Sequence, residues 1–121
     1  MQRTIMTVDD SPSMRMLLNA ALSDLGYAII AAEDGRAALD QLRDLRPDLI
    51  ITDINMPHLD GFGLIEQLRG MPEHANRPIL VLTTESSDEK KARARQAGAT
   101  GWIVKPFDPV KLAAAIRRVL H

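Results

Sequence analysis

Charged or hydroxyl side chains stand where short apolar runs of this sequence end. They are Asp9 and Asp10 after TIMTV, Asp53 after LIIT, Thr83 at the end of ILVLT, and Lys105 after WIV. Three carboxylates that lie close together repel one another, by about 4 kcal/mol per pair at about 4 Å with moderate screening. A hard divalent cation relieves that repulsion, and Mg²⁺ prefers carboxylate, carbonyl and water oxygens. With a lysine and a hydroxyl nearby, such a site is suited to neutralise a phosphoryl group during transfer.

One carboxylate among the three would be the nucleophile, because an aspartate can accept a phosphoryl group as an acyl phosphate. Asp53 ends the apolar run of residues 48–53, which is typical of a strand covered on both faces. In open α/β sheets, ligands bind at the carboxyl ends of the strands. The alternative is that Asp53 only caps the turn that follows.

These side chains can meet only if the chain alternates strands with helices. Apolar runs predict five strands, at residues 4–8, 27–33, 48–53, 79–83 and 102–104. Helical periodicity predicts five helices, after Ser11-Pro12, from about Ala38 to before Pro47, around Leu64 to near Gly70, from the Ser86 capping box to Ala97, and after Asp108-Pro109. The alternation predicts an α/β domain with a mainly parallel sheet and helices on both faces. Since parallel strands end along one edge, the five side chains should converge there.

Composition narrows the class of protein. The 121 residues fit one domain, 1–121, and 45% hydrophobic with 26% charged residues is ordinary for a globular protein. Fifteen Lys and Arg against 16 Asp and Glu give no field that points to nucleic acid. There is no cysteine, and hence no disulfide or thiolate metal site. No signal-peptide core and no apolar stretch long enough to span a bilayer is present, so we expect a cytoplasmic single domain without an appended effector.

Five segments, taken in order, resemble the receiver domain of two-component response regulators over the whole chain. They are VDDSPSMR at 8–15, DGRAAL at 34–39, DLIITDINMPHLDG at 48–61, VLTTES at 81–86 and AGATGWIVKPF at 97–107. The resemblance implies a flavodoxin-like, CheY-like fold with the strand order 2-1-3-4-5, which the spacing of the runs does not itself determine.

The resemblance also implies roles for the clustered residues. Asp53 matches the phosphorylated aspartate, while Asp9 and Asp10 match the acidic pair that binds Mg²⁺. Asn55 matches the position that gives a backbone carbonyl to the metal, and Lys105 the lysine that pairs with the phosphoryl group.

Further positions match the family's switching residues. Thr83 matches the switch hydroxyl, and Trp102 the switch aromatic, where Tyr or Phe is more usual. The proline after the lysine, Pro106, usually follows a cis peptide in this family, which is easily accommodated only before proline. Asn55 and Glu85 resemble residues that set the rate of acyl-phosphate hydrolysis.

Each role has a structural alternative. Asp9 and Asp10 could cap the first helix, although Ser11 already offers a cap. The lysine could be a solvated loop residue, and Thr83 could be a buried hydroxyl bonded to backbone. Trp102, the only tryptophan, could serve core or interface packing alone.

The resemblance implies phosphoryl transfer to Asp53 from a CheA-like histidine kinase or a small acyl phosphate. We expect a phosphoacceptor that assists its own phosphorylation and dephosphorylation, and not a turnover enzyme. Phosphorylation would draw Thr83 inward and let Trp102 repack the face formed by the fourth helix, fifth strand and fifth helix.

The output suggested by the resemblance is binding to another protein. The loop segments look most like the chemotaxis group, whose target is the flagellar motor switch. The fourth helix departs from that group because Lys90, Lys91, Arg93 and Arg95 leave little apolar surface. The second interpretation is a phosphorelay intermediate or phosphate sink that exchanges phosphate with a histidine phosphotransfer domain, through the first helix and the loop after the fifth strand.

Two other classes share parts of the pattern. A flavodoxin-like cofactor binder needs a Ser/Thr/Gly-rich phosphate loop after the first strand, and here that loop opens with Asp9 and Asp10. A haloacid-dehalogenase-type phosphatase needs a second aspartate two residues after its nucleophile, and Asn55 stands there. Both classes are disfavoured.

Overall fold

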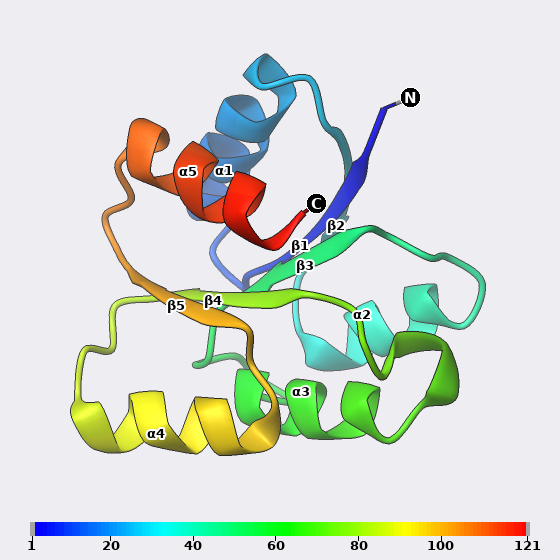
Figure 1. The fold of residues 1–121 in the computed structure, drawn as a ribbon. Coiled ribbons are helices and arrows are strands. Elements are labelled where there is room, and N and C mark those ends of the chain that lie inside the picture. Colours follow the sequence, from blue (N-terminus) through cyan, green and yellow to red (C-terminus); the bar gives the residue numbers. More distant parts are fainter. Residues whose placement is uncertain (1, 121) are drawn as a thin grey trace.

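Strands and helices alternate along residues 2–120, the part of the chain that the computed structural model describes (Figure 1). The strands are β1 (Thr4–Val8), β2 (Ala28–Ala32), β3 (Leu49–Thr52), β4 (Ile79–Thr83) and β5 (Gly101–Val104). The helices are α1 (Pro12–Asp24), α2 (Gly35–Leu42), α3 (Gly61–Arg69), α4 (Asp88–Ala97) and α5 (Pro109–Val119), with a short 3₁₀ helix, η1 (Pro72–His74), before β4. Among the described residues, no helix is long and apolar enough to cross a membrane.

The five strands form one parallel sheet in the order β2-β1-β3-β4-β5. This order confirms the fold class predicted from the sequence and the strand order implied by the resemblance. From β1 the chain adds β2 on one side, and from β2 it then crosses to the other side of β1 to add β3. The strands β2 and β5 therefore form the edges of the sheet, and β1, β3 and β4 lie inside it.

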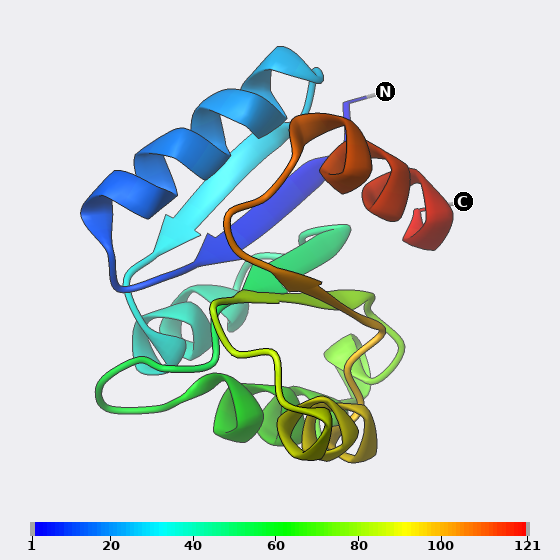
Figure 2. The same ribbon diagram turned by 90° about the vertical axis from the view of Figure 1, so that its left-hand side faces the viewer.

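Helices cover both faces of the sheet. In Figures 1 and 2, α1 and α5 lie on one face, and α2, α3 and α4 on the other. Successive residues of a strand point to opposite faces, so a strand covered on both sides must be apolar throughout. In β3, Ile50 joins the core under α2–α4, and its neighbour Ile51 joins the core under α1 and α5.

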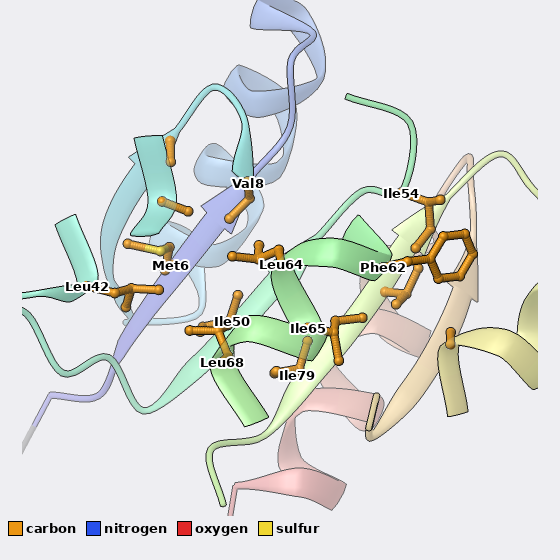
Figure 3. Close-up of a cluster of buried hydrophobic side chains, with 14 residues drawn as sticks. Met6, Val8, Leu42, Ile50, Ile54, Phe62, Leu64, Ile65, Leu68 and Ile79 are labelled. Carbon is orange, nitrogen blue, oxygen red and sulfur yellow. The ribbon is translucent and has the colours of Figure 1, made fainter. Parts of the chain in front are cut away.

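Each face has its own hydrophobic core. Figure 3 shows the larger one, in which Leu64, Ile65 and Leu68 of α3 gather with Ile50 and Ile79 of the sheet. On the opposite face, fully buried leucines and isoleucines of the two helices cover the sheet; these are Leu18, Leu22, Leu112 and Ile116. The two cores hold the sheet rigidly enough to position residues at its edge.

The boundaries of two helices differ from the sequence prediction. Helix α2 begins earlier than expected because the Asp34 carboxylate caps it by accepting from the Ala37 N–H at 2.8 Å. The same helix ends at Leu42, well before Pro47. Helix α4 is capped by Ser87, whose hydroxyl accepts from the Lys90 N–H at 3.2 Å, and not by Ser86. Two adjacent serines offer the same capping chemistry, so the pattern alone could not select between them.

Candidate functional site

The strand register brings the predicted side chains to one edge of the sheet. Val8 pairs with Thr52, so Asp9 and Asp53 emerge at the same level, whereas β5 extends two residues further along the same edge before Lys105. The Lys105 ammonium donates to the Asp9 Oδ2 at 2.7 Å and to the Asp53 Oδ2 at 2.8 Å. The sequence therefore predicted this convergence correctly.

Burial makes this arrangement electrostatically strong. Asp9 is 2% exposed and Asp53 is 9% exposed. Burial alone would lower the pKa of Lys105, but the hydrogen bonds and charges of Asp53 and Asp9 outweigh it and raise that pKa above its ordinary value. Lys105 is therefore a fixed positive charge at neutral pH. The peptide bond between Lys105 and Pro106 is cis, as the resemblance implied.

A third carboxylate completes a group able to hold a metal ion. Asp9, Asp10 and Asp53 each offer an oxygen, and the three oxygens lie within 4.8 Å of one another. Asp10 is exposed, which leaves a path from solvent to the group. Lys105 compensates only one of the three negative charges, so a divalent cation would neutralise the cluster. Oxygen-only donors with this charge fit Mg²⁺.

Local hydrogen bonds position the two buried carboxylates. The Asp9 Oδ1 accepts from the Ser11 N–H at 2.9 Å, while the Ser11 hydroxyl caps α1 by accepting from the Met14 N–H. The Asp53 Oδ1 accepts from the Ile54 N–H at 2.6 Å. Each carboxylate thus uses one oxygen to fix its loop and turns the other toward Lys105. Ser11 is the cap of α1, so the structural alternative in which Asp9 or Asp10 caps this helix is wrong.

Backbone contacts support the same loops. The guanidinium of Arg15 donates to the Asp9 carbonyl, and the Thr52 hydroxyl donates to the Asp53 carbonyl at 2.8 Å. Gly61, the first residue of α3, lies against Asp53, and a Cβ built at Gly61 would come 2.3 Å from the Asp53 carbonyl oxygen. No role for Arg15, Thr52 or Gly61 could be predicted from the sequence alone. The Asp60-Gly61 pair was visible as a turn signal, but nothing in the sequence indicated that the helix start would pack on the Asp53 backbone.

The residues with predicted switching roles are linked through Glu85. Thr83 is fully buried, and its hydroxyl accepts from the Glu85 N–H at 3.4 Å. The Trp102 indole N–H donates to the Glu85 carbonyl at 3.1 Å, and its ring packs against the larger core. Thr83 is thus a buried hydroxyl bonded to backbone, as its structural alternative held. Trp102 is half-buried beside the loop that follows β4.

The side chain of Glu85 joins two further elements. Its Oε1 accepts from the Asn55 Nδ2 at 3.1 Å and pairs with the Lys90 ammonium at 2.9 Å. The hydrogen bond from Lys90, and then the one from Asn55, lower the pKa of Glu85 below its ordinary value. Glu85 therefore connects the β3–α3 loop to the first turn of α4. The carbonyl of Asn55 as a metal ligand stays a prediction.

Comparison with known proteins agrees with this geometry. Residues 5–117 match the model of the response regulator receiver domain. The chemotaxis protein CheY4 of Vibrio cholerae is 43% identical, with a TM-score of 0.94 over 99% of this chain and 100% of that one. The receiver domain of the sensor histidine kinase PA1611 of Pseudomonas aeruginosa is 28% identical, with a TM-score of 0.92 over 99% of this chain and 98% of that one. That domain was solved with a magnesium ion coordinated in its active-site cleft.

Curated relatives include longer proteins. The probable transcriptional regulator ycf27 of Porphyridium aerugineum is 40% identical over 97% of this chain and 48% of its own length. The response regulator MprA of Mycolicibacterium vanbaalenii is also 40% identical, over 97% of this chain and 50% of its own length. The chain thus spans about half the length of these relatives. Fold, motifs and family match together establish that the chain belongs to the response regulator receiver domains.

Proposed function

We propose that the chain is a phosphoacceptor in a two-component system, with Asp53 receiving the phosphoryl group. The donor would be a phosphohistidine of a CheA-like histidine kinase, or a small acyl phosphate. The observation that carries this proposal is the single ammonium of Lys105, held between Asp9 and Asp53 at 2.7 and 2.8 Å beside the exposed Asp10. No such constellation is needed for packing, because burying charges costs free energy.

In the proposed transfer, a carboxylate oxygen of Asp53 forms a bond to phosphorus while the bond from phosphorus to the donor imidazole nitrogen breaks. The leaving imidazole nitrogen takes up a proton. Lys105 holds Asp53 in place and presents a positive charge to the transferred oxygens, where charge spreads in the transition state. Asp9, Asp10, Asp53 and the Asn55 carbonyl would hold Mg²⁺, which when bound neutralises charge on those oxygens.

A phosphoryl group on Asp53 would accept a hydrogen bond from the Thr83 hydroxyl, whose oxygen now accepts from the Glu85 N–H, and would draw that hydroxyl inward. Because Glu85 also holds Trp102 through its carbonyl, a shift of Thr83 would be passed to β5 and α4. The output surface in this proposal is the face of α4, β5 and α5.

The proposed output is a chemotaxis signal, with a flagellar motor switch protein as target. The support is the match to CheY4, in which both chains are covered almost completely. If the chain is instead part of a longer protein like the transcriptional regulators it matches, the same face would act on the remaining part of that protein.

A phosphorelay intermediate or phosphate sink is the second candidate, and a specific feature favours it. Helix α1 exposes Met16 by 73% and Leu17 by 62%, and the first turn of α5 exposes Val110 by 75%. Both helices lie on one face of the sheet, and α1 begins at the edge where β1 ends (Figure 2). Apolar side chains exposed there suit docking of a histidine phosphotransfer domain.

The proposal is tested by following radiolabelled acetyl phosphate with Mg²⁺. A phosphoacceptor retains at most one label per chain, in an alkali-labile acyl phosphate, and does not turn over p-nitrophenyl phosphate. Sustained release from that ester, with no label retained, would instead indicate a phosphatase. Asn55→Asp is the matched variant, because it supplies the second aspartate that the dehalogenase-type phosphatases require.

A further inference from the structure

We propose that the His58–Asp34 pair positions the metal-binding loop: it fastens the β3–α3 loop to the start of α2 and thereby sets the affinity of the acidic cluster for Mg²⁺. This inference rests on the proposed function, in which the Asn55 carbonyl of that loop would be a ligand of the metal. It adds two positioning residues that act on the site through the backbone, and it links α2 to the reacting edge of the sheet.

The side chains of His58 and Asp34 form the contact between the loop and the helix. The His58 Nδ1 lies 2.8 Å from the Asp34 Oδ2, while the Asp34 Oδ1 accepts from the Ala37 N–H and caps α2. The hydrogen bond from Ala37, and then the one from His58, lower the pKa of Asp34 below its ordinary value, so this carboxylate is ionised at neutral pH. The shared proton therefore belongs to the His58 Nδ1, which donates in the neutral Nδ1–H tautomer and in the charged ring alike.

Backbone contacts beside this pair show how closely the loop and the helix approach. The Gly35 N–H donates to the Leu59 carbonyl at 3.2 Å, and a Cβ built at Gly35 would come 2.6 Å from that oxygen. Asp34 is 5% exposed, whereas 67% of the His58 side chain is exposed. An exposed side chain thus reaches back to a buried carboxylate, and two adjacent residues of the loop are held to α2.

The backbone of His58 indicates that this contact is imposed on the loop. Its φ is +68°, and no other residue except glycine has a positive φ in the part of the chain that the structure describes. The Leu59 N–H donates to the Pro57 carbonyl at 2.7 Å, so the chain makes a γ-turn around His58, of the rare kind with a positive φ. Such a conformation persists only where the surroundings hold it. The bond to Asp34 is a side-chain contact that holds it here.

The loop held in this way carries the Asn55 carbonyl. Its two ends are joined by the Gly61 N–H, which donates to the Ile54 carbonyl at 2.8 Å, and the Asn55 amide ties it to Glu85. On the side of α2, the contacts described above hold it. The direction of a backbone carbonyl depends on the torsions of its loop, so release from α2 would spread the Asn55 carbonyl over several directions. Removing a residue that orients a metal ligand typically weakens metal binding by about 10-fold or more.

Isothermal titration calorimetry with MgCl₂ at neutral pH measures this effect on the full chain. His58→Gly accepts the positive φ and lacks the side chain, so relief of strain alone would leave or strengthen the affinity for Mg²⁺. We expect instead a weakening of about 3- to 10-fold, because the pair acts on the ligand through the backbone. His58→Asn should restore the affinity to within about 2-fold of the wild type, because asparagine tolerates a positive φ and its Nδ2 stands as many bonds from Cα as the His58 Nδ1.

A double-mutant cycle separates the pair from the added flexibility of glycine. Asp34→Ser keeps a capping hydroxyl for α2 but removes the partner of His58, so it should weaken Mg²⁺ binding, and His58→Gly should then weaken it no further. Asp40→Ser is the matched control for loss of charge. It removes an exposed carboxylate of the same helix, paired only with the exposed Arg43 among the described residues, and should leave the affinity unchanged.

Hydrogen exchange gives a readout that needs no metal. In the metal-free chain, the amides of Gly35 and Leu59 should exchange faster in His58→Gly than in the wild type, and at the wild-type rate in His58→Asn. Equal Mg²⁺ affinity of the wild type and His58→Gly would overturn the proposal. So would an undiminished effect of His58→Gly in the Asp34→Ser chain, a failure of His58→Asn to restore the affinity, or a wild type that binds no Mg²⁺.

The intact mass of the wild type after treatment with acetyl phosphate and Mg²⁺ separates this test from that of the proposed function. A wild type that binds Mg²⁺ but gains no phosphoryl group refutes the phosphoacceptor role alone. A wild type that gains the phosphoryl group, with the same Mg²⁺ affinity as His58→Gly, refutes the positioning role of the His58–Asp34 pair alone.

Discussion

At the residue scale, one ammonium holds two buried carboxylates together. Lys105 contacts both Asp9 and Asp53, and each of these aspartates also accepts from a backbone N–H of its own loop. Removing one partner of such a buried group leaves uncompensated charge, which costs far more than an exposed ion pair contributes. Removing one of these three side chains should therefore destabilise the fold, although burying the cluster as a whole costs free energy.

The raised pKa of Lys105 predicts a dependence of stability on alkaline pH. A group whose pKa is higher in the folded state stabilises the fold fully below its ordinary pKa of 10.5, and this contribution is lost as the pH rises through the raised value. The unfolding free energy of the wild type should therefore fall more steeply above about pH 10.5 than that of Lys105→Met. Urea unfolding over that range measures both slopes, and parallel slopes would contradict the prediction.

Gly61 predicts a second effect at single-residue scale. The methyl group of Gly61→Ala would meet the Asp53 carbonyl oxygen at 2.3 Å, which is backbone and cannot yield easily. We expect a loss of about 1–3 kcal/mol in unfolding free energy, as for overpacked sites, together with slower phosphorylation of Asp53. Gly63→Ala is the matched control, since the closest atom to its methyl group would be the far end of the Leu59 side chain, at 2.6 Å, and no backbone atom is among its nearest contacts. Equal loss in the two variants by urea unfolding would refute the role of Gly61.

The sequence predicts which reactive residues meet, but it does not predict what supports them. Asp9, Asp53 and Lys105 could be placed together because all follow parallel strands, and the two hydrogen bonds of Lys105 confirm this. The packing of Gly61 on Asp53 depends on the path of the β3–α3 loop, which has no periodic pattern. The hydrogen bond between Asn55 and Glu85 joins two loops 30 residues apart, for which spacing offers no signal.

At the scale of elements, Glu85 joins the loop after β4 to the loop after β3 and to α4. Its lowered pKa means that the fold gains stability from this carboxylate above its ordinary pKa of 4.5, and that the gain is lost as pH falls through the lower folded value. Glu85→Gln should therefore show a weaker loss of stability between about pH 5 and pH 3. Urea unfolding of the two proteins across that range checks this. A difference in unfolding free energy between the wild type and Glu85→Gln that is the same at every pH would contradict this prediction.

Helix boundaries show where local pattern fails at this scale. Two adjacent serines precede α4, and capping preference alone does not distinguish Ser86 from Ser87. The start of α2 depends on the capping Asp34 carboxylate, whereas the Asp34-Gly35 pair in the sequence predicts only a turn. The start of α1 was predicted correctly, because Ser11 and Pro12 combine two independent signals.

At the scale of the whole molecule, folding itself assembles the acidic cluster, because Asp53 is distant in sequence from the adjacent pair Asp9 and Asp10. A metal that binds only the folded state must stabilise it, by about 2.7 kcal/mol at a hundredfold excess over the dissociation constant. Mg²⁺ should thus raise the unfolding free energy of the wild type, and much less that of Asp10→Asn, whose exposed side chain lies outside both cores. Equal Mg²⁺ dependence in both proteins would refute the cluster as the metal site.

The fold as a whole was the most predictable level. Regular alternation of strands and helices is sufficient to predict a parallel α/β domain, because right-handed crossovers leave few other solutions. The order of the strands is different, since several orders satisfy the same alternation. That order came from the resemblance, and the structure confirms it.

The most direct test of the account is the intact mass of the chain after brief incubation with acetyl phosphate, with and without Mg²⁺, beside Asp53→Asn. The account predicts a labile gain of one phosphoryl group in the wild type with Mg²⁺, and no gain without the metal or in the variant. The same gain in Asp53→Asn would contradict it, because the phosphoryl group would then reside elsewhere.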